Sequence, residues 1–251
     1  MAQGILDESI KSLLIEMKYN GTTLATGTAF IVTMQSGPVL ITNRHNITGR
    51  HPSTDQPLSP TAGVPNEMLI HHNKKQLFGQ WTEAVEPLYD DGNPLWHEHP
   101  TLGGKADFAA LKLTNWDEAQ IYHYIPSNPG HDILIGPTDS VSVIGFPFGF
   151  AAGGKFAIWV TGTVASEPDV DYNDLPILLI DCRSRKGQSG SPVIAFRSNG
   201  QYINSSGAHV STNVPVCRFI GIYSRRLNEE SDLGIVWKAT AIQELIESIR
   251  W

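Results

Sequence analysis

Cysteine and charge are both scarce in this chain of 251 residues. It has only two cysteines, Cys182 and Cys217, whereas secreted proteins of modest size often carry several disulfides. We therefore expect a reducing compartment, and a bond between these two thiols stays open, because sequence does not give their separation. Charged residues make up 17% of the chain and the net charge is −7. This balance argues against binding nucleic acid, which needs a basic face.

Long hydrophobic runs are absent as well. No segment approaches the roughly 18 apolar residues of a membrane-spanning helix. The first nine residues, MAQGILDES, lack a basic segment followed by an apolar core, so they do not look like a signal peptide. We expect no membrane association and a cytoplasmic location. The apolar fraction of 41% is that of an ordinary globular protein.

Apolar residues recur at helical spacing near both ends of the chain. They predict an N-terminal helix within residues 1–20, from Ile10, Leu13, Leu14 and Met17. They also predict a C-terminal helix within residues 239–251, from Ile242, Leu245, Ile246 and Ile249. Short apolar segments between them, cut by glycine, proline and asparagine, are typical of antiparallel sheets that close or stack.

These segments form two groups, joined by a polar connector at residues 119–139. The first group, within residues 21–118, has predicted strands at 23–34, 38–42, 67–71 and 107–113. The second group, within residues 140–238, has predicted strands at 140–146, 156–165, 177–181, 192–196, 219–223 and 234–237. The sequence therefore predicts an all-β fold in two halves, with a helix at either end.

A serine between glycines stands in the segment 187–192, Gly-Gln-Ser-Gly-Ser-Pro. Such a turn can expose the hydroxyl of Ser189 and aim neighbouring N–H groups at one point, as a nucleophile beside an oxyanion hole requires. His45 follows an apolar segment and Asp107 precedes one. We predict that they supply the base and the group that orients it. The rival acids Asp90 and Asp91 lie in a polar, turn-like segment.

Six segments give the chain a resemblance to trypsin-like (chymotrypsin-fold) serine proteases of the short bacterial kind, similar to glutamyl endopeptidases and Deg-type protease domains. The segments are 27–32 (GTAFIV), 40–45 (LITNRH), 107–111 (DFAAL), 143–147 (VIGFP), 187–193 (GQSGSPV) and 219–224 (FIGIYS). They occur in the family's order. The resemblance implies two antiparallel β-barrels of six strands each, a protein or peptide substrate, and no cofactor.

The resemblance also implies a role for each site residue. Ser189 would attack the carbonyl carbon, His45 would take its proton and deliver it to the leaving amine, and Asp107 would orient His45. The N–H groups of Gly187 and Ser189 would form the oxyanion hole. Ser224 would support Asp107, or else be a strand serine facing solvent. Arg183 or Ser184 would match the family's selector residue on one wall of the substrate pocket, and Tyr223 would lie on the opposite wall.

Two positions depart from the family's pattern. Gln188 stands where trypsin-like zymogens place the aspartate that pairs with a new N-terminus, so we expect no activation of that kind. Tyr223 stands where glutamyl endopeptidases have a histidine, so selectivity for glutamate does not carry over.

A cluster of cations flanks the predicted nucleophile. It consists of Arg183, Arg185, Lys186, Arg225 and Arg226. Positive charge in a cleft attracts anions, which predicts a preference for acidic residues near the cleavage site. The alternative is a solvated loop whose charges point away from the cleft.

Other functions fit less of the sequence. An esterase would need Gly-x-Ser-x-Gly and a histidine after the serine, but residue 191 is serine and only His209 follows. A catalytically silent binding or regulatory module on a protease fold is the main alternative to a peptidase.

The remaining histidines predict no metal site. The segments 71–72 (HH) and 97–99 (HEH) lack the His-Glu-x-x-His spacing of a zinc protease, so we expect structural or exposed roles. A cytoplasmic protease of broad specificity would damage its host. We therefore expect narrow specificity or a regulatory protein partner.

Overall fold

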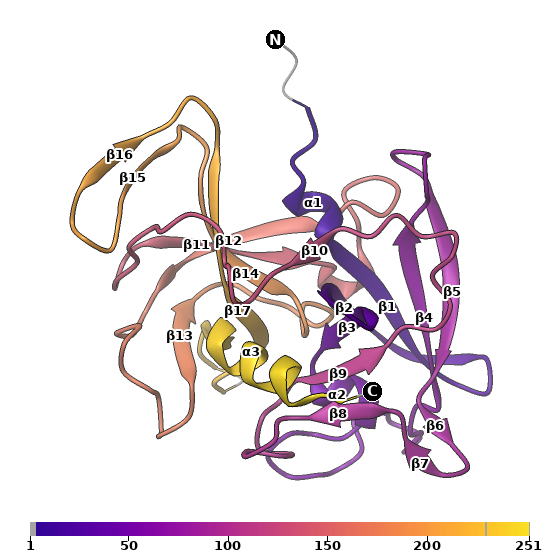
Figure 1. Ribbon diagram of the computed structural model, residues 1–251. Helices are drawn as coiled ribbons and strands as arrows, with labels where there is room; N and C mark the ends of the chain where they lie inside the picture. The colour runs from indigo at the N-terminus through magenta and orange to yellow at the C-terminus, as the bar shows by residue number, and fades with distance from the viewer. Residues whose placement is uncertain (1–3, 229, 251) are drawn as a thin grey trace.

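The computed structural model describes residues 4–228 and 230–250. Two β-rich halves lie side by side, and the C-terminal helix lies in front of the junction between them (Figure 1). The N-terminal half supplies the predicted histidine and aspartate, and the C-terminal half supplies the predicted serine. The junction between the halves is therefore where these residues can meet.

The N-terminal half is one sheet of eight strands. The strand order is β5-β4-β1-β2-β3-β9-β8, and a short strand, β10, pairs in parallel with β2. A short helix, α2 (Arg44–Thr48), follows β3. The strand bounds are β1 Ser12–Tyr19, β2 Thr22–Met34, β3 Gly37–Thr42, β4 Glu67–Asn73, β5 Trp81–Pro87, β8 Trp96–Glu98, β9 Ala109–Lys112 and β10 His123–Tyr124. A separate two-stranded sheet pairs β6 (Tyr89–Asp90) with β7 (Asn93–Pro94).

The C-terminal half is a closed barrel of six strands, in the order β11-β12-β13-β18-β17-β14. The strand bounds are β11 Ser140–Gly145, β12 Ile158–Val164, β13 Ile177–Asp181, β14 Pro192–Arg197, β17 Val216–Arg226 and β18 Leu233–Lys238. A 3₁₀ turn, η1 (Pro147–Gly149), follows β11. The hairpin of β15 (Gln201–Ile203) and β16 (His209–Ser211) projects from this half (Figure 1).

The predicted all-β class and the six-stranded C-terminal barrel are confirmed. The prediction of six strands for the N-terminal half is wrong, because that sheet has eight. Its edge strands β5 and β8 were not predicted. Most of β5 is exposed or half-buried, and β8 has only three residues, so neither has the apolar run that marked the other strands. Within residues 119–139, β10 pairs with β2 of the N-terminal half.

The predicted N-terminal helix is also wrong. Of the described residues 4–20, only Glu8–Lys11 are helical, as α1, and residues 12–19 form β1 between β2 and β4. Leu13 and Ile15 pack into one hydrophobic cluster, while Leu14 packs into another. A strand that is covered on both faces has a nearly continuous apolar sequence, and periodicity does not separate it from a buried helix. The N-terminal half therefore begins at β1, not at residue 21.

The predicted C-terminal helix is confirmed as α3 (Ala239–Ser248). Ile242 and Leu245 are fully buried on its inner face. They belong to the same hydrophobic cluster as Phe108 of the N-terminal half and Trp237 of the barrel, whose rings lie 5.5 Å apart. The helix therefore packs against both halves.

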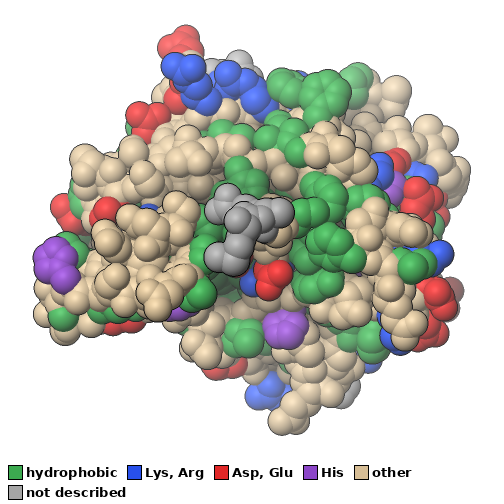
Figure 2. All heavy atoms as spheres, turned by 90° about the horizontal axis from the view of Figure 1, so that it is seen from above, with side chains coloured by type: hydrophobic (Ala, Val, Ile, Leu, Met, Phe, Trp, Pro, Cys, Tyr) green, Lys and Arg blue, Asp and Glu red, His purple; other side chains and the backbone are tan. Residues whose placement is uncertain are grey.

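No helix within residues 4–228 and 230–250 combines the length and the apolar character needed to cross a membrane. Hydrophobic side chains do reach the surface: they gather on the face shown in Figure 2, with charged side chains mainly toward its edges. Phe78, Phe148 and Phe150 are each more than half exposed.

The two cysteines are separate free thiols, which answers the question that the sequence left open. Burial raises the pKa of Cys182 to about 11, and the nearby negative charges of Asp181 and Asp232 add to the shift. Burial also raises the pKa of Cys217 to about 12, with a further contribution from Glu8.

We predict that both thiols react slowly in the folded chain. At pH 8, a pKa raised from 9.0 to about 11 reduces the thiolate form of Cys182 by about 100-fold. Iodoacetamide should therefore modify two thiols quickly in denaturant and neither of them on the same time scale in the native chain, as followed by mass spectrometry. Equal rates in both states would contradict the burial of these thiols.

Candidate active site

His45 and Asp107 come from separate segments of the N-terminal half. His45 lies on α2, directly after β3, and Asp107 lies two residues before β9, the strand that pairs with β3. The His45 ring nitrogen Nδ1 is 2.7 Å from Asp107 Oδ2, and the backbone N–H of His45 donates to Asp107 Oδ1 at 3.1 Å. A carboxylate only accepts hydrogen bonds, so Nδ1 is the nitrogen that donates to Asp107, and in the neutral imidazole Nε2 is then the acceptor.

Ser224 completes the surroundings of the Asp107 carboxylate. It lies on β17, and its hydroxyl donates to Asp107 Oδ2 at 2.5 Å. Ser224 is 1% exposed and Asp107 is 3% exposed. The alternative of a strand serine facing solvent is therefore wrong. A buried carboxylate needs such donors, because an unpaired charge away from water is costly.

Ser189 and His45 line one cavity of about 370 Å³. Gly187, Lys186 and Arg225 also line it, together with apolar side chains from β2 and from residues 49–65. Among the described residues, the Ser189 hydroxyl makes no hydrogen bond to His45.

The backbone of Ser189 is held from across the junction. Its carbonyl oxygen accepts hydrogen bonds from the Thr28 N–H at 3.0 Å and from Asn46 Nδ2 at 3.1 Å. Thr28 Oγ1 donates to the Gly187 carbonyl at 2.8 Å. Asn46 directly follows His45, so the histidine and the serine are positioned by neighbouring groups. Neither Thr28 nor Asn46 was predicted from the sequence to have a role, although Thr28 lies in the matched segment 27–32.

The turn before Ser189 gives the Gly187 peptide a defined orientation. The Lys186 carbonyl accepts a hydrogen bond from the Phe148 N–H at 2.6 Å. Because C=O and N–H point in opposite directions across a trans peptide, this bond turns the Gly187 N–H away from Phe148. Gly187 has φ of +91°, and a Cβ at this position would collide with the Phe146 carbonyl oxygen. Only glycine fits here.

Gln188 closes the same turn with its side chain. The side chain is fully buried, and its Oε1 accepts a hydrogen bond from the Arg185 N–H at 2.7 Å. The Gln188 N–H donates to the Arg185 carbonyl at 3.2 Å. The two bonds close the turn of residues 185–188.

The three residues expected on the walls of the substrate pocket have different surroundings. The hydroxyl of Ser184 is hydrogen-bonded to that of Tyr223, and the two residues are 1% and 2% exposed. Burial raises the pKa of Tyr223 to about 12. Arg183, in contrast, is exposed. The structure therefore brings Ser184 and Tyr223 together and leaves Arg183 outside this pair.

The cations near Ser189 have no acidic partner among the described residues. Lys186 and Arg225 line the cavity beside Ser189. The Arg225 guanidinium donates to Ser53 Oγ at 3.1 Å, and that of Arg185 donates to the Ser184 carbonyl at 2.9 Å. Two of the five cations thus face the cavity.

His71 and His72 have structural surroundings, whereas His51 lines the cavity beside Ser189. His71 Nε2 lies 3.0 Å from Glu16 Oε1, and its Nδ1 lies 3.3 Å from Glu83 Oε1. Burial, together with the charge of His71, lowers the pKa of His72 to about 4. Over the described part of the chain, no three His, Cys, Asp or Glu side chains gather closely enough to hold a metal ion.

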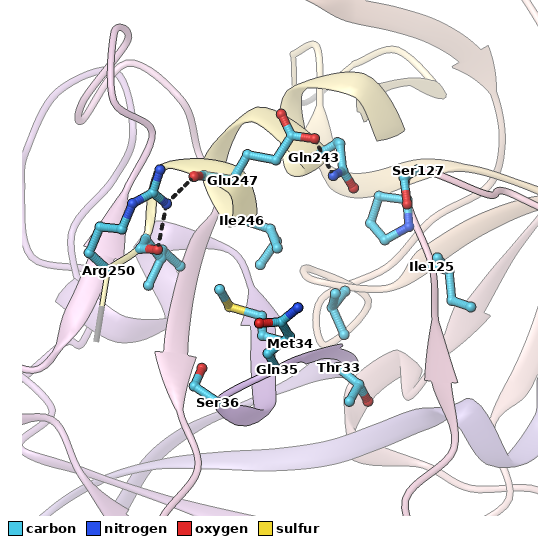
Figure 3. A pocket seen from close by; sticks show the side chains of 13 residues that line it. Thr33, Met34, Gln35, Ser36, Ile125, Ser127, Gln243, Ile246, Glu247 and Arg250 are labelled. Atoms are coloured by element: carbon cyan, nitrogen blue, oxygen red, sulfur yellow. Dashed lines mark hydrogen bonds between the residues drawn. The ribbon is translucent and has the colours of Figure 1, made fainter.

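A second cavity, of about 730 Å³, lies away from these residues between α3 and the end of β2. Met34 and Ile246 project into it from opposite sides (Figure 3). None of the predicted site residues lines it.

We predict that Ser224→Ala lowers the free energy of unfolding by about 1–3 kcal/mol, because it removes a donor from a buried carboxylate. Ser211→Ala, at an exposed serine of β16, should change it by less than about 0.5 kcal/mol. Chemical denaturation of the two variants and the parent chain measures both values. Equal effects would contradict the role of Ser224 as a support for Asp107.

Solved structures of other proteins share the fold of this chain. A search of characterised protein sequences finds no match. Among solved structures, the chain is similar to the serine endoprotease from Yersinia pestis, with a TM-score of 0.53 and 15% identity over 95% of this chain. It spans 62% of the length of that enzyme. It is also similar to the active form of the Rv3671c protease from M. tuberculosis, with a TM-score of 0.50 and 14% identity over 96% of this chain and 82% of the other.

At these identities, the structural likeness establishes the fold alone, which is chymotrypsin-like. This is the fold expected from the sequence motifs. The trypsin-like peptidase domain family matches residues 27–203 directly. This match covers more than half of the chain and includes His45, Asp107 and Ser189. The chain belongs to the trypsin-like peptidase family.

Proposed function

We propose that the chain is a serine endopeptidase that cleaves peptide bonds through an acyl-enzyme. The observation that carries this proposal is the hydrogen-bonded pair of His45 and Asp107, with Ser189 in the wall of the same cavity. A peptidase of this type needs a nucleophile, a base with a free nitrogen facing it, and a group that orients the base. In this chain, Ser189, His45 and Asp107 would take these three roles.

In the first half of the reaction, Ser189 Oγ attacks the carbonyl carbon of the substrate while His45 Nε2 takes the hydroxyl proton. The carbonyl oxygen becomes an oxyanion, which the N–H groups of Gly187 and Ser189 bind. Loss of one such donor typically costs about 3 kcal/mol in the barrier. His45 then gives the proton to the leaving nitrogen, the C–N bond breaks, and the acyl group stays on Ser189.

Hydrolysis of the acyl-enzyme repeats the same chemical steps with water as the nucleophile. His45 takes a proton from the water, the hydroxide adds to the ester carbonyl, and the proton passes to Ser189 Oγ as the acid product leaves. Asp107 keeps the proton of His45 on Nδ1 throughout and stabilises the imidazolium that forms in each half.

The turn that carries the oxyanion hole supports a site that does not depend on a new N-terminus. The side chain of Gln188 is buried within the turn and accepts a hydrogen bond from the Arg185 N–H. The Phe148 N–H donates to the Lys186 carbonyl and so orients the peptide between Lys186 and Gly187. We therefore propose that the cleft is active without cleavage of the N-terminal segment. A regulatory protein partner and a cytoplasmic location stay predictions.

A preference for acidic residues near the scissile bond is the second part of the proposal. Lys186 and Arg225 line the cavity beside Ser189 and have no acidic partner among the described residues. In a chain with a net charge of −7, this local positive charge would attract an acidic segment and repel a basic one.

The alternative is a catalytically silent module that binds peptides on the same fold. It is favoured only by the missing hydrogen bond between Ser189 and His45 in the described structure. The alternative predicts a folded chain with an unreactive serine.

We predict that a fluorophosphonate probe labels the chain and that Ser189→Ala abolishes the labelling. Mapping of new N-termini in a proteome treated with each form should show cleavage sites whose formation falls at least about a thousandfold with Ser189→Ala. Ser198→Ala, at an exposed serine of the same half, is the matched control and should behave as the parent chain. A folded parent chain that takes no label would support the silent module instead.

We further predict that Lys186→Glu and Arg225→Glu each lower kcat/KM about tenfold for peptides with acidic residues near the scissile bond, relative to neutral peptides. Added salt should reduce the difference. Lys75→Glu makes the same change in net charge at an exposed site outside the cavity, so it should leave the ratio unchanged. An equal effect of all three variants would show that only the overall charge matters.

A further inference from the structure

The position of His45 shows on which side of Ser189 each half of a bound substrate would lie, the leaving-group half or the acyl half. His45 must reach the leaving nitrogen to protonate it. The cavity that contains His45, lined by β2 and by residues 49–65, therefore faces the leaving-group side. The acyl side, on the other side of Ser189, faces the C-terminal half. There the chain before the nucleophile, residues 183–188, runs close to the end of β17, as the hydrogen bond between the Ser184 and Tyr223 hydroxyls shows.

Tyr223 fills the space between these two segments. Its backbone is paired with the nucleophile turn: its N–H donates to the Ser191 carbonyl at 2.8 Å, and its carbonyl accepts from the Gly190 N–H at 3.0 Å. Its hydroxyl is hydrogen-bonded to that of Ser184, five residues before Ser189. Its ring lies against β18, where a Cβ at Gly234 would come within 2.6 Å of Tyr223 Cε2.

The phenol is held as part of the barrel core. Tyr223 is 2% exposed and belongs to the same hydrophobic cluster as Cys182, Val193 and Val236. Moving the ring out would expose its apolar surface and leave the buried Ser184 hydroxyl without its partner. The ring is therefore a fixed wall.

We propose that Tyr223 occupies the volume which the substrate side chain on the acyl side of the scissile bond would otherwise enter. The chain then accepts glycine, alanine or serine at that position and rejects leucine, phenylalanine and arginine. This inference rests on the proposed function for the direction in which substrate lies. Arg183 is exposed rather than at the base of a pocket, so attraction of acidic groups acts at other substrate positions.

The test measures binding and cleavage separately. Fluorescent product peptides that differ only in their C-terminal residue (Gly, Ala, Leu, Phe or Arg) are titrated against the Ser189→Ala chain by fluorescence polarisation. The corresponding uncleaved peptides are assayed with the parent chain. We expect the small residues to be preferred at least about tenfold in both assays, since poor fit of side chains in a pocket gives discrimination of this order.

Two substitutions at Tyr223 identify the cause of the preference. Tyr223→Ala should open the volume and shift the preference toward leucine and phenylalanine by at least about tenfold. Tyr223→Phe keeps the ring and removes only the hydroxyl, so the preference for small residues should persist. Circular dichroism and thermal melting show whether each variant is folded, and the parent chain tests the proposal even if Tyr223→Ala does not fold.

The outcomes separate the inference from the proposed function. If the parent chain takes no fluorophosphonate label but its Ser189→Ala form binds the small-residue peptides best, the peptidase proposal fails and the role of Tyr223 stands. If the chain is labelled but prefers large residues, the role of Tyr223 is overturned and the peptidase stands. The role of Tyr223 is also overturned if Tyr223→Ala and Tyr223→Phe shift the residue preference identically, or if no peptide binds at all.

Discussion

The hydrogen bonds of Thr28 hold the nucleophile turn against the other half of the molecule. Its N–H donates to the Ser189 carbonyl, its hydroxyl donates to the Gly187 carbonyl, and the same hydroxyl accepts from the Phe146 N–H. Thr28 is fully buried, and hydrogen bonds are electrostatically stronger away from water. Together with the bond from Asn46 Nδ2 to the Ser189 carbonyl, these bonds fix the position of Ser189 relative to His45, although the two residues belong to different halves.

The turn itself contains features that are unfavourable on their own. Gly187 and Gly190 both have φ near +90° and contact backbone oxygens so closely that a side chain could not be accommodated. Gln188 Nε2 and Ser191 Oγ are buried without a partner among the described residues, at a cost of about 1–3 kcal/mol for each unsatisfied group. The contacts with Thr28, Asn46 and Phe148 offset part of this cost. Such a turn is stable only inside the assembled molecule.

Charge and shape act at different places in the site. The cations that face the cavity are exposed or half-buried, so their effect is long-ranged and sensitive to salt. Tyr223 is buried and neutral, and it acts through volume at one position. A substrate would be attracted by its acidic groups and admitted according to the size of one side chain, and these two requirements together would give the narrow specificity expected of such a peptidase.

The sequence by itself determined the all-β class, most strands of both halves, the C-terminal helix and the candidate residues His45, Asp107 and Ser189, because apolar alternation and short motifs are local signals. Only the tertiary structure decided that residues 12–19 form a strand, since an apolar run buried on both faces has no distinguishing period. It also decided which groups Thr28 and Tyr223 contact. Their contacts with Ser189 and Ser184 span 161 and 39 positions of the chain, and what each side chain does follows from what folding places beside it.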